Sequence, residues 1–169
     1  MTLIHDTDIW QGRLAALPLV SYGAGETVFT EGTRTGKLVI LRSGAVTIVK
    51  GGTEIAKVAE PGAVFGELSA LLDRPHTADV RTLETSQFHV ADAAALLEQD
   101  PAALLYVATV MARRLDAANQ AFLELKNQLH TGQPPRLIDK TIARIEGLLG
   151  AIGDGYIRAG AGLSMYPPT

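Results

Sequence analysis

The sequence predicts an α+β protein: an antiparallel β-roll or jelly-roll barrel with flanking helices and a long C-terminal dimerisation helix. Between residues 28 and 90, short segments rich in Val, Ile and Thr are separated by glycines at close intervals, which is typical of antiparallel barrels and sandwiches. Residues 102–129 contain no glycine or proline, and their apolar positions alternate spacings of four and three. That spacing predicts a long helix with one apolar stripe.

The first expected element is a short amphipathic segment over residues 7–17, with Ile9, Leu14 and Leu17 as its apolar positions and Pro18 as its end. Strand-like segments follow it. They alternate with turn residues, as strands of an antiparallel sheet do. The predicted strands are residues 28–30, 38–41, 46–49, 55–59 and 87–90.

Two hairpins are expected between these strands. Gly51-Gly52 predicts a two-residue hairpin, because glycine readily adopts the positive φ angles that such a turn requires. A second hairpin is expected over residues 38–49, with its turn at Ser43-Gly44. No internal repeat is evident along the chain.

The pattern changes from strand to helix at Asp92. This residue is expected to cap a short helix that runs through Leu97. Asp100-Pro101 is a second helix start, with aspartate at the N-cap and proline at the first helical position. From there the helical pattern continues to about Leu129.

The long helix is expected to do more than cover its own barrel. A helix of about 29 residues is about 43 Å long, which exceeds the width of a small barrel. Part of it is expected to pack on the barrel, and its distal half on a second copy of the chain, so that residues 101–129 form a homodimer. The alternative is a helix that serves only its own domain. The apolar stripe consists of Leu104, Ala108, Met111, Leu115, Ala118, Phe122, Leu125 and Leu129, and the expected dimer seam of Met111, Leu115, Ala118, Phe122 and Leu125.

Two regions are expected along the chain. Residues 1–130 form one domain that includes the long helix, and residues 131–169 form a short helical appendage with a helix over 136–149 and a Gly/Pro-rich tail. The second region is smaller than an independent domain. Its four Lys and Arg residues stand against three acids, which gives no electrostatic footprint for DNA.

Composition narrows the class of protein. The chain has 169 residues, 47% of them apolar, which is enough for a hydrophobic core. The net charge of −3 gives no general attraction to nucleic acid or to an anionic membrane. There is no cysteine for a disulfide or a thiolate site, and no apolar run approaches the roughly 18 residues of a membrane span. A soluble, cytoplasmic protein is the expectation.

The candidate binding site is the run from Phe65 to Ala78. Gly66 allows a tight turn and a close approach to a ligand, and Glu67 opens a short helix whose first amides favour an anion. Thr77 then supplies a hydroxyl donor and Ala78 a free amide. Glycine, acid, short helix and hydroxyl together are suited to holding a sugar and its phosphate.

This run resembles the phosphate-binding cassette of the cyclic nucleotide-binding domain family, which includes the catabolite activator protein. The order of barrel, cassette, short helix and long helix matches that family over about residues 8–129. The resemblance implies a regulatory protein without enzymatic activity or a bound cofactor, whose ligand is cAMP or cGMP. The supporting stretches are residues 23–32, the hairpin 38–49, residues 61–67 and residues 111–115.

The resemblance also implies roles for individual residues. Glu67 accepts a hydrogen bond from the ribose 2′-hydroxyl, Arg114 reaches toward Glu67, and Asn119 contacts the base, beside Ala118. Each has a structural alternative: a helix-start acid, a solvated helix charge, and a polar residue beside the seam. The implied ligand-binding set is Phe65, Gly66, Glu67, Leu68, His76, Thr77, Ala78, Arg114 and Asn119.

His76 departs from the family pattern, which has an arginine at this position to pair with the cyclic phosphate. Histidine offers a shorter contact and is mostly neutral near pH 7, so about ten- to a hundredfold in affinity is expected to be lost. If histidine takes over the contact, binding should strengthen as pH falls through about 6.5. The alternatives are that Arg74 replaces the lost charge, or that His76 fills a pocket without a ligand.

The expected function is a stand-alone sensory or regulatory module with weak or altered cAMP or cGMP binding. The alternative is a degenerate module that binds no nucleotide and acts through contacts with an unidentified protein partner. A metal-dependent enzyme of the related double-stranded β-helix class is disfavoured, because the histidines are scattered and none has a His-x-His spacing. They are His5, His76, His89 and His130.

Overall fold

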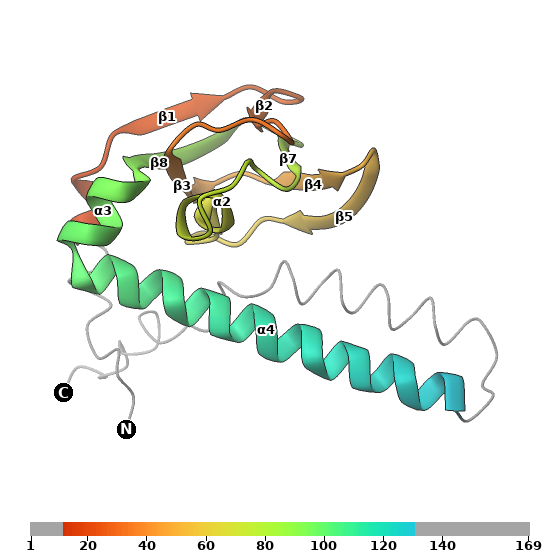
Figure 1. The fold of residues 1–169 in the computed structure, drawn as a ribbon. Coiled ribbons are helices and arrows are strands. Elements are labelled where there is room, and N and C mark those ends of the chain that lie inside the picture. Colours follow the sequence, from red (N-terminus) through yellow and green to blue (C-terminus); the bar gives the residue numbers. More distant parts are fainter. Residues whose placement is uncertain (1–11, 131–169) are drawn as a thin grey trace, which may run out of the picture.

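The computed structural model describes residues 12–130. Two four-stranded antiparallel sheets lie against each other above a long helix, α4 (Figure 1). This confirms the predicted α+β class and the antiparallel roll. The predicted appendage and tail over 131–169, with the helix over 136–149, lie outside the described residues, as does Ile9.

Along the chain, every connection between consecutive strands crosses from one sheet to the other, except the hairpin from β4 to β5. The first sheet has the order β1-β8-β3-β6 and the second the order β2-β7-β4-β5, and all neighbours are antiparallel. The bounds in the first sheet are β1 Leu19–Tyr22, β8 Ser86–Asp92, β3 Lys37–Ser43 and β6 Val64–Phe65. Those in the second are β2 Thr27–Phe29, β7 Asp79–Thr82, β4 Val46–Lys50 and β5 Thr53–Val58.

The hairpin predicted at Gly51-Gly52 is confirmed. Lys50 pairs with Thr53, so two residues connect β4 to β5. Both glycines have positive φ, 55° and 81°, as the twist of a tight hairpin requires.

The prediction of a hairpin over residues 38–49 is wrong. β3 pairs with β6 and β8, whereas β4 pairs with β5 and β7, so the chain passes from one sheet to the other at this turn. Gly44 allows the crossing: its φ is 100°, and a Cβ built there would lie 2.2 Å from Ser86 Oγ. The turn residues Ser43-Gly44 therefore form a corner at which the chain passes between the two sheets, and not the turn of a hairpin.

β3 is buried on both faces, and it separates two layers of core. Val39 and Leu41 point between the sheets, where they pack with Phe65 and Phe88. Leu38 and Ile40 point the other way, toward the helices. This explains the continuous apolar run of β3, because each alternate face of the strand meets a different layer.

The helix starts follow the predicted capping chemistry. α3 spans Ala93–Gln99, and the Asp92 side chain accepts a hydrogen bond from the Ala95 N–H at 3.0 Å. α4 spans Pro101–His130, and Asp100 Oδ1 accepts from the Ala102 and Ala103 N–H groups at 3.0 and 3.2 Å. A helical turn over residues 12–15 precedes β1, with Leu14 and Leu17 packed against the core.

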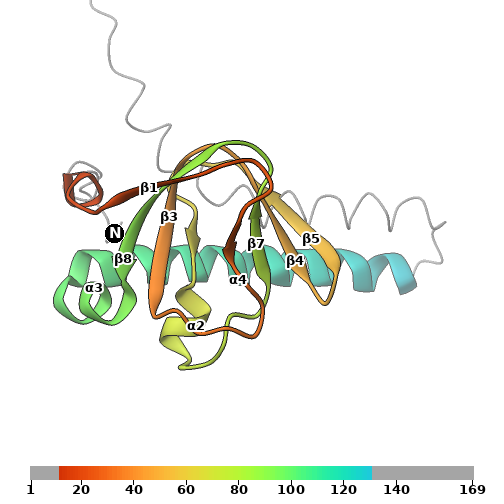
Figure 2. The same cartoon turned by 90° about the horizontal axis from the view of Figure 1, so that it is seen from above.

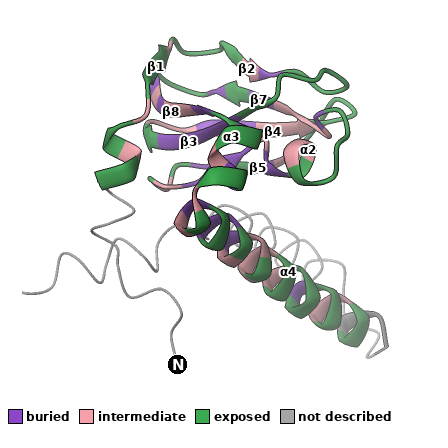
Figure 3. Cartoon of the chain, turned by 60° about the vertical axis from the view of Figure 1, so that its left-hand side comes forward, coloured by how far each residue is buried: buried purple, intermediate pink, exposed green. Residues whose placement is uncertain are grey.

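Only the first part of α4 packs on the roll, and the helix extends beyond it (Figures 2 and 3). Its buried contacts are made by Ala103, Tyr106, Val107 and Val110, which are displaced from much of the predicted stripe, although Met111 of that stripe also packs against this core. Leu115 and Phe122 of the predicted seam are 63% and 66% exposed. Within residues 12–130, no helix is long and apolar enough to cross a membrane.

Candidate functional site

The site begins where β6 turns into the short helix α2, which spans Glu67–Leu71. Gly66 occupies the N-cap with φ 90°, and a Cβ there would lie 2.5 Å from the Lys37 carbonyl oxygen. Both the positive φ and the close approach require glycine. This turn places Glu67 beneath the roll, facing α4.

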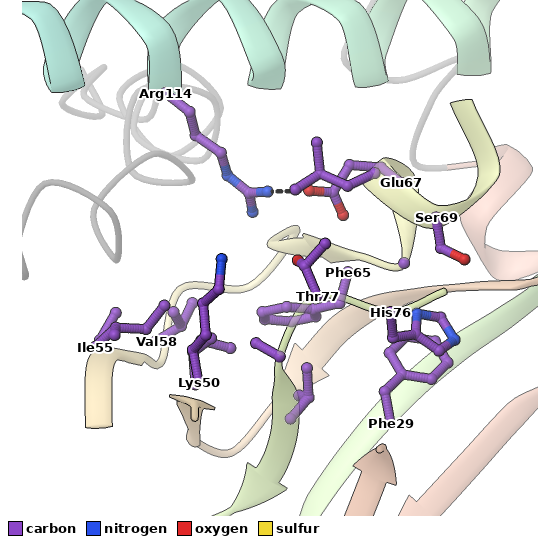
Figure 4. A pocket seen from close by; sticks show the side chains of 16 residues that line it. Phe29, Lys50, Ile55, Val58, Phe65, Glu67, Ser69, His76, Thr77 and Arg114 are labelled. Atoms are coloured by element: carbon purple, nitrogen blue, oxygen red, sulfur yellow. Dashed lines mark hydrogen bonds and ion pairs between the residues drawn. The ribbon is translucent and has the colours of Figure 1, made fainter. Parts of the chain in front are cut away.

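Glu67 and Arg114 form an ion pair in which the glutamate is buried and the arginine is half-buried, drawn as a dashed line in Figure 4. The Arg114 Nη1 donates to Glu67 Oε1 at 2.5 Å, and its Nη2 donates to the Val64 carbonyl at 2.8 Å. Glu67 is only 4% exposed, and burial raises the pKa of its carboxyl group, an effect that Arg114 partly offsets. The pair connects α2 to α4 across 47 residues of sequence.

A pocket of about 300 Å³ opens between this ion pair and the sheet of β4 and β5. That volume is at the lower end of the range for small-molecule sites. Eight of the nine residues in the implied ligand-binding set line it, and Asn119, exposed on α4, does not. Thr77 and Ala78 are half-buried in the wall that follows His76.

His76 is 5% exposed, and contacts with neighbouring residues of the domain hold it in place. Its ring stacks on Phe29, with centroids 4.1 Å apart, and its Nε2 lies 2.9 Å from Thr35 Oγ1. Its main chain exchanges hydrogen bonds with Gly32 and Thr33 at 2.8 Å. Burial lowers the pKa of the imidazole, so the neutral form is favoured in the free protein. This environment opposes the protonated contact to phosphate that the sequence suggested.

Arg74 does not line the pocket, so this structure gives no support for its replacing the missing charge. Its main chain is used to close the turn after α2, where the Arg74 N–H donates to Ser69 O and the Ser69 hydroxyl donates to Arg74 O. Within residues 12–130, no three His, Asp or Glu side chains gather as metal ligands.

Sequence reasoning missed several residues of the pocket wall. Phe29 supports the His76 ring, Ile55 and Val58 contribute apolar surface from β5, and Lys50 contributes an ammonium group from the end of β4. The alternation of β4 was the available signal for Lys50, because Ile48 and Lys50 lie on one face of the strand. It could be used only once that face was known to be the pocket side.

Comparisons with known proteins agree with this geometry. Residues 19–99 match the family model described as cyclic nucleotide-binding domain. A search of curated proteins gave no significant match.

Solved structures share the fold. The catabolite activator protein of Thermus thermophilus is 20% identical, with a TM-score of 0.56 over 98% of this chain and 88% of that one. The N-terminal domain of a transcriptional regulator from Streptomyces coelicolor A3(2) is 24% identical, with a TM-score of 0.51 over 70% of this chain and 89% of that one. The fragment PfPKA-R (141–441), solved with cAMP bound, is 21% identical, with a TM-score of 0.51 over 70% of this chain.

The chain spans less than two thirds of the length of some matched structures, 38% in the case of PfPKA-R. All three share the fold of this chain, in which Gly66 forms the turn, Glu67 is the buried acid and α4 is the long helix. Residues 19–99 of this chain are a cyclic nucleotide-binding domain and belong to that family.

Proposed function

We propose that this chain is a regulatory module whose pocket binds a cyclic nucleotide, cAMP or cGMP, with an affinity weakened at position 76. The observation that carries the proposal is the Glu67–Arg114 pair at the pocket wall. An ion pair removed from water is costly to maintain, and it is a poor way to gain stability alone. Its position in a cavity favours a role in binding.

The ion pair orients the Glu67 carboxylate so that it can accept a hydrogen bond from a ligand. Arg114 holds one carboxylate oxygen of Glu67, which fixes the orientation of the carboxyl group beside the pocket and favours its charged form against the effect of burial on its pKa. A fixed carboxylate is a strong acceptor for a sugar hydroxyl. By resemblance to the family, that hydroxyl is the ribose 2′-hydroxyl.

The weakness follows from the environment of His76. Its Nε2 is engaged by Thr35, its ring is packed on Phe29, and it is favoured in the neutral form. A neutral, engaged ring replaces none of the charge of an arginine. The loss of one charge-assisted hydrogen bond is about 1.5–3 kcal/mol, which corresponds to about ten- to a hundredfold in affinity.

A second candidate function is a degenerate module that binds no nucleotide and acts through protein contacts. The same packing of His76 favours it, because a side chain buried in the domain stabilises the empty cassette. The partner would then meet exposed apolar side chains at α2 or on α4. Leu71, Leu72, Leu115 and Phe122 are exposed there.

The experiment that separates the two candidates is calorimetric titration of the wild-type protein and His76→Arg with cAMP and cGMP. We expect weak saturable binding by the wild type and binding about ten- to a hundredfold tighter by His76→Arg. The added variant Glu67→Ala should remove the gain, because it removes the ribose acceptor. Folding of each variant is checked by circular dichroism.

Each outcome decides between the candidates. Binding by the wild type that is lost in Glu67→Ala supports nucleotide sensing through this pocket. No binding by the wild type or by folded His76→Arg at millimolar nucleotide refutes it and favours the degenerate module. Binding by His76→Arg alone shows a cassette that the histidine has switched off.

A further inference from the structure

The ionisable side chains of the pocket differ in whether they already have a partner. The ionisable side chains that line it are Lys50, Glu67, His76 and Arg114. Arg114 is paired with Glu67, and the two charges offset each other. His76 is buried against Phe29 and Thr35. Within residues 12–130, Lys50 is the remaining cation of the pocket wall, and no ion pair there involves it.

The fold points Lys50 into this pocket. Side chains of a strand alternate between faces, and Lys50 shares its face of β4 with Ile48, which also lines the pocket. Figure 4 shows the Lys50 side chain extending from β4 toward the side of the pocket where Arg114 and Glu67 lie. Lys57, on the neighbouring strand, does not line the pocket and pairs with Glu54 at 3.4 Å.

The base of the Lys50 side chain is held in place. Lys50 is the last residue of β4 and pairs with Thr53 across the two-residue turn. The next residue, Gly51, donates its N–H to Glu31 Oε2 at 2.9 Å, which ties the hairpin to the loop after β2. The ammonium group can therefore move on its own flexible stem while the hairpin stays in position.

We propose that Lys50 supplies the positive charge that receives the anionic cyclic phosphate, in place of a donor at position 76. This inference rests on the proposed function and adds a ligand-binding residue to it. A lysine is a mobile point charge, whereas an arginine presents two donors in a fixed plane. A phosphate held by Lys50 is therefore bound less tightly than one held by an arginine, in agreement with a weak site.

The inference is tested by calorimetric titration with cAMP of four intact proteins: the wild type, Lys50→Met, Lys50→Arg and Lys57→Met. Lys50→Met keeps the apolar stem and removes the charge, and we expect it to weaken cAMP binding about tenfold. Lys50→Arg keeps the charge and should stay within about threefold of the wild type. Lys57→Met is the matched control on the adjacent strand and should bind as the wild type does.

The dependence of cAMP affinity on salt concentration is a second measurement, and a change in the shape of the side chain alone would not alter it. Raising the salt concentration screens the attraction between an ammonium group and a phosphate. The wild type and Lys57→Met should therefore lose affinity with salt, and Lys50→Met should lose less. Lys50 is exposed, so each variant should fold, which circular dichroism checks.

Two results would overturn the inference while leaving nucleotide binding intact. The first is wild-type affinity in Lys50→Met. The second is an equal loss in Lys50→Arg and Lys50→Met, which would assign the effect to shape. Failure of the wild-type protein to bind either cAMP or cGMP would instead refute the proposed function, and the inference with it.

Discussion

Removal of Arg114 tests whether the ion pair beneath the pocket is as strongly coupled as its geometry indicates. Arg114→Met keeps most of the side-chain volume and removes both donated hydrogen bonds, to Glu67 and to the Val64 carbonyl. Glu67, with a side chain 5% exposed, is then left as a buried carboxylate without its cation.

The magnitude follows from the burial of the two partners. Breaking a buried pair by removing one member costs about 3–5 kcal/mol. The Arg114 side chain is 21% exposed, so water already screens part of the pair, and we expect about 3 kcal/mol, near the lower end. Glu67→Gln should cost less, because the guanidinium left behind has access to water.

A double-mutant cycle isolates the coupling. The cost of Arg114→Met should be smaller by about 1–3 kcal/mol when Glu67→Gln is already present. The assay is urea unfolding followed by circular dichroism, with the midpoint shifted and the slope unchanged. Equal costs of Arg114→Met in the two backgrounds would refute the reasoning.

The cost should also depend on pH in a defined direction. Burial raises the pKa of Glu67 above its ordinary value of 4.5, and without Arg114 the rise is larger. A carboxyl with a raised pKa binds its proton more readily in the fold than in the unfolded chain. The cost of Arg114→Met is therefore complete above the folded-state pKa and shrinks as pH falls toward 4.5. A cost independent of pH would contradict this.

Three further predictions concern the backbone, the histidine and the long helix. Gly66→Ala should lower the free energy of unfolding by more than about 2 kcal/mol, because it adds a Cβ 2.5 Å from the Lys37 carbonyl oxygen at φ 90°. The control Gly36→Ala, at φ 64° with nothing within 4 Å, should cost about 1 kcal/mol. Equal costs of the two substitutions in urea unfolding would contradict the close approach at Gly66. Burial lowers the pKa of His76, so its contribution to stability is complete above about pH 6.5 and is lost as pH falls toward the folded-state pKa. His76→Gln should reduce this slope of stability with pH, to which His89, whose pKa burial also lowers, contributes as well; an unchanged slope would contradict the prediction. Light scattering of the intact protein should give a dimer mass that Phe122→Asp reduces, since a charge in an apolar seam is costly; a monomer mass for the wild type at tens of micromolar would exclude the proposed dimer.

Local chemistry carried the predictions that hold. Asp92 and Asp100 cap α3 and α4 through bonds to residues two or three positions away, so the sequence alone contains them. Gly51-Gly52 specifies its turn in the same way, because both residues need positive φ. The run at Gly66-Glu67 was recognisable because its glycine, acid and hydroxyl have fixed spacing.

Features that depend on distant partners were not predictable in this way. The turn at Ser43-Gly44 is locally like a hairpin, and only the pairing of β4 with β7 shows that it is a corner. The orientation of His76 is set by Thr35, 41 residues earlier, and by Phe29. The packed face of α4 is displaced from much of the predicted stripe because Ala103 and Val107 meet the roll, where small or β-branched side chains fit closely.

The central claim is that the pocket bounded by Glu67, Thr77 and Lys50 binds a cyclic nucleotide. The most direct test is to titrate the ¹⁵N-labelled intact protein separately with cAMP and with cGMP, each up to several millimolar, and to follow the backbone amide shifts. Binding at this site predicts saturable shifts concentrated at residues 65–68, 76–78 and 50. The absence of saturable shifts, or saturable shifts on another surface, would contradict the claim.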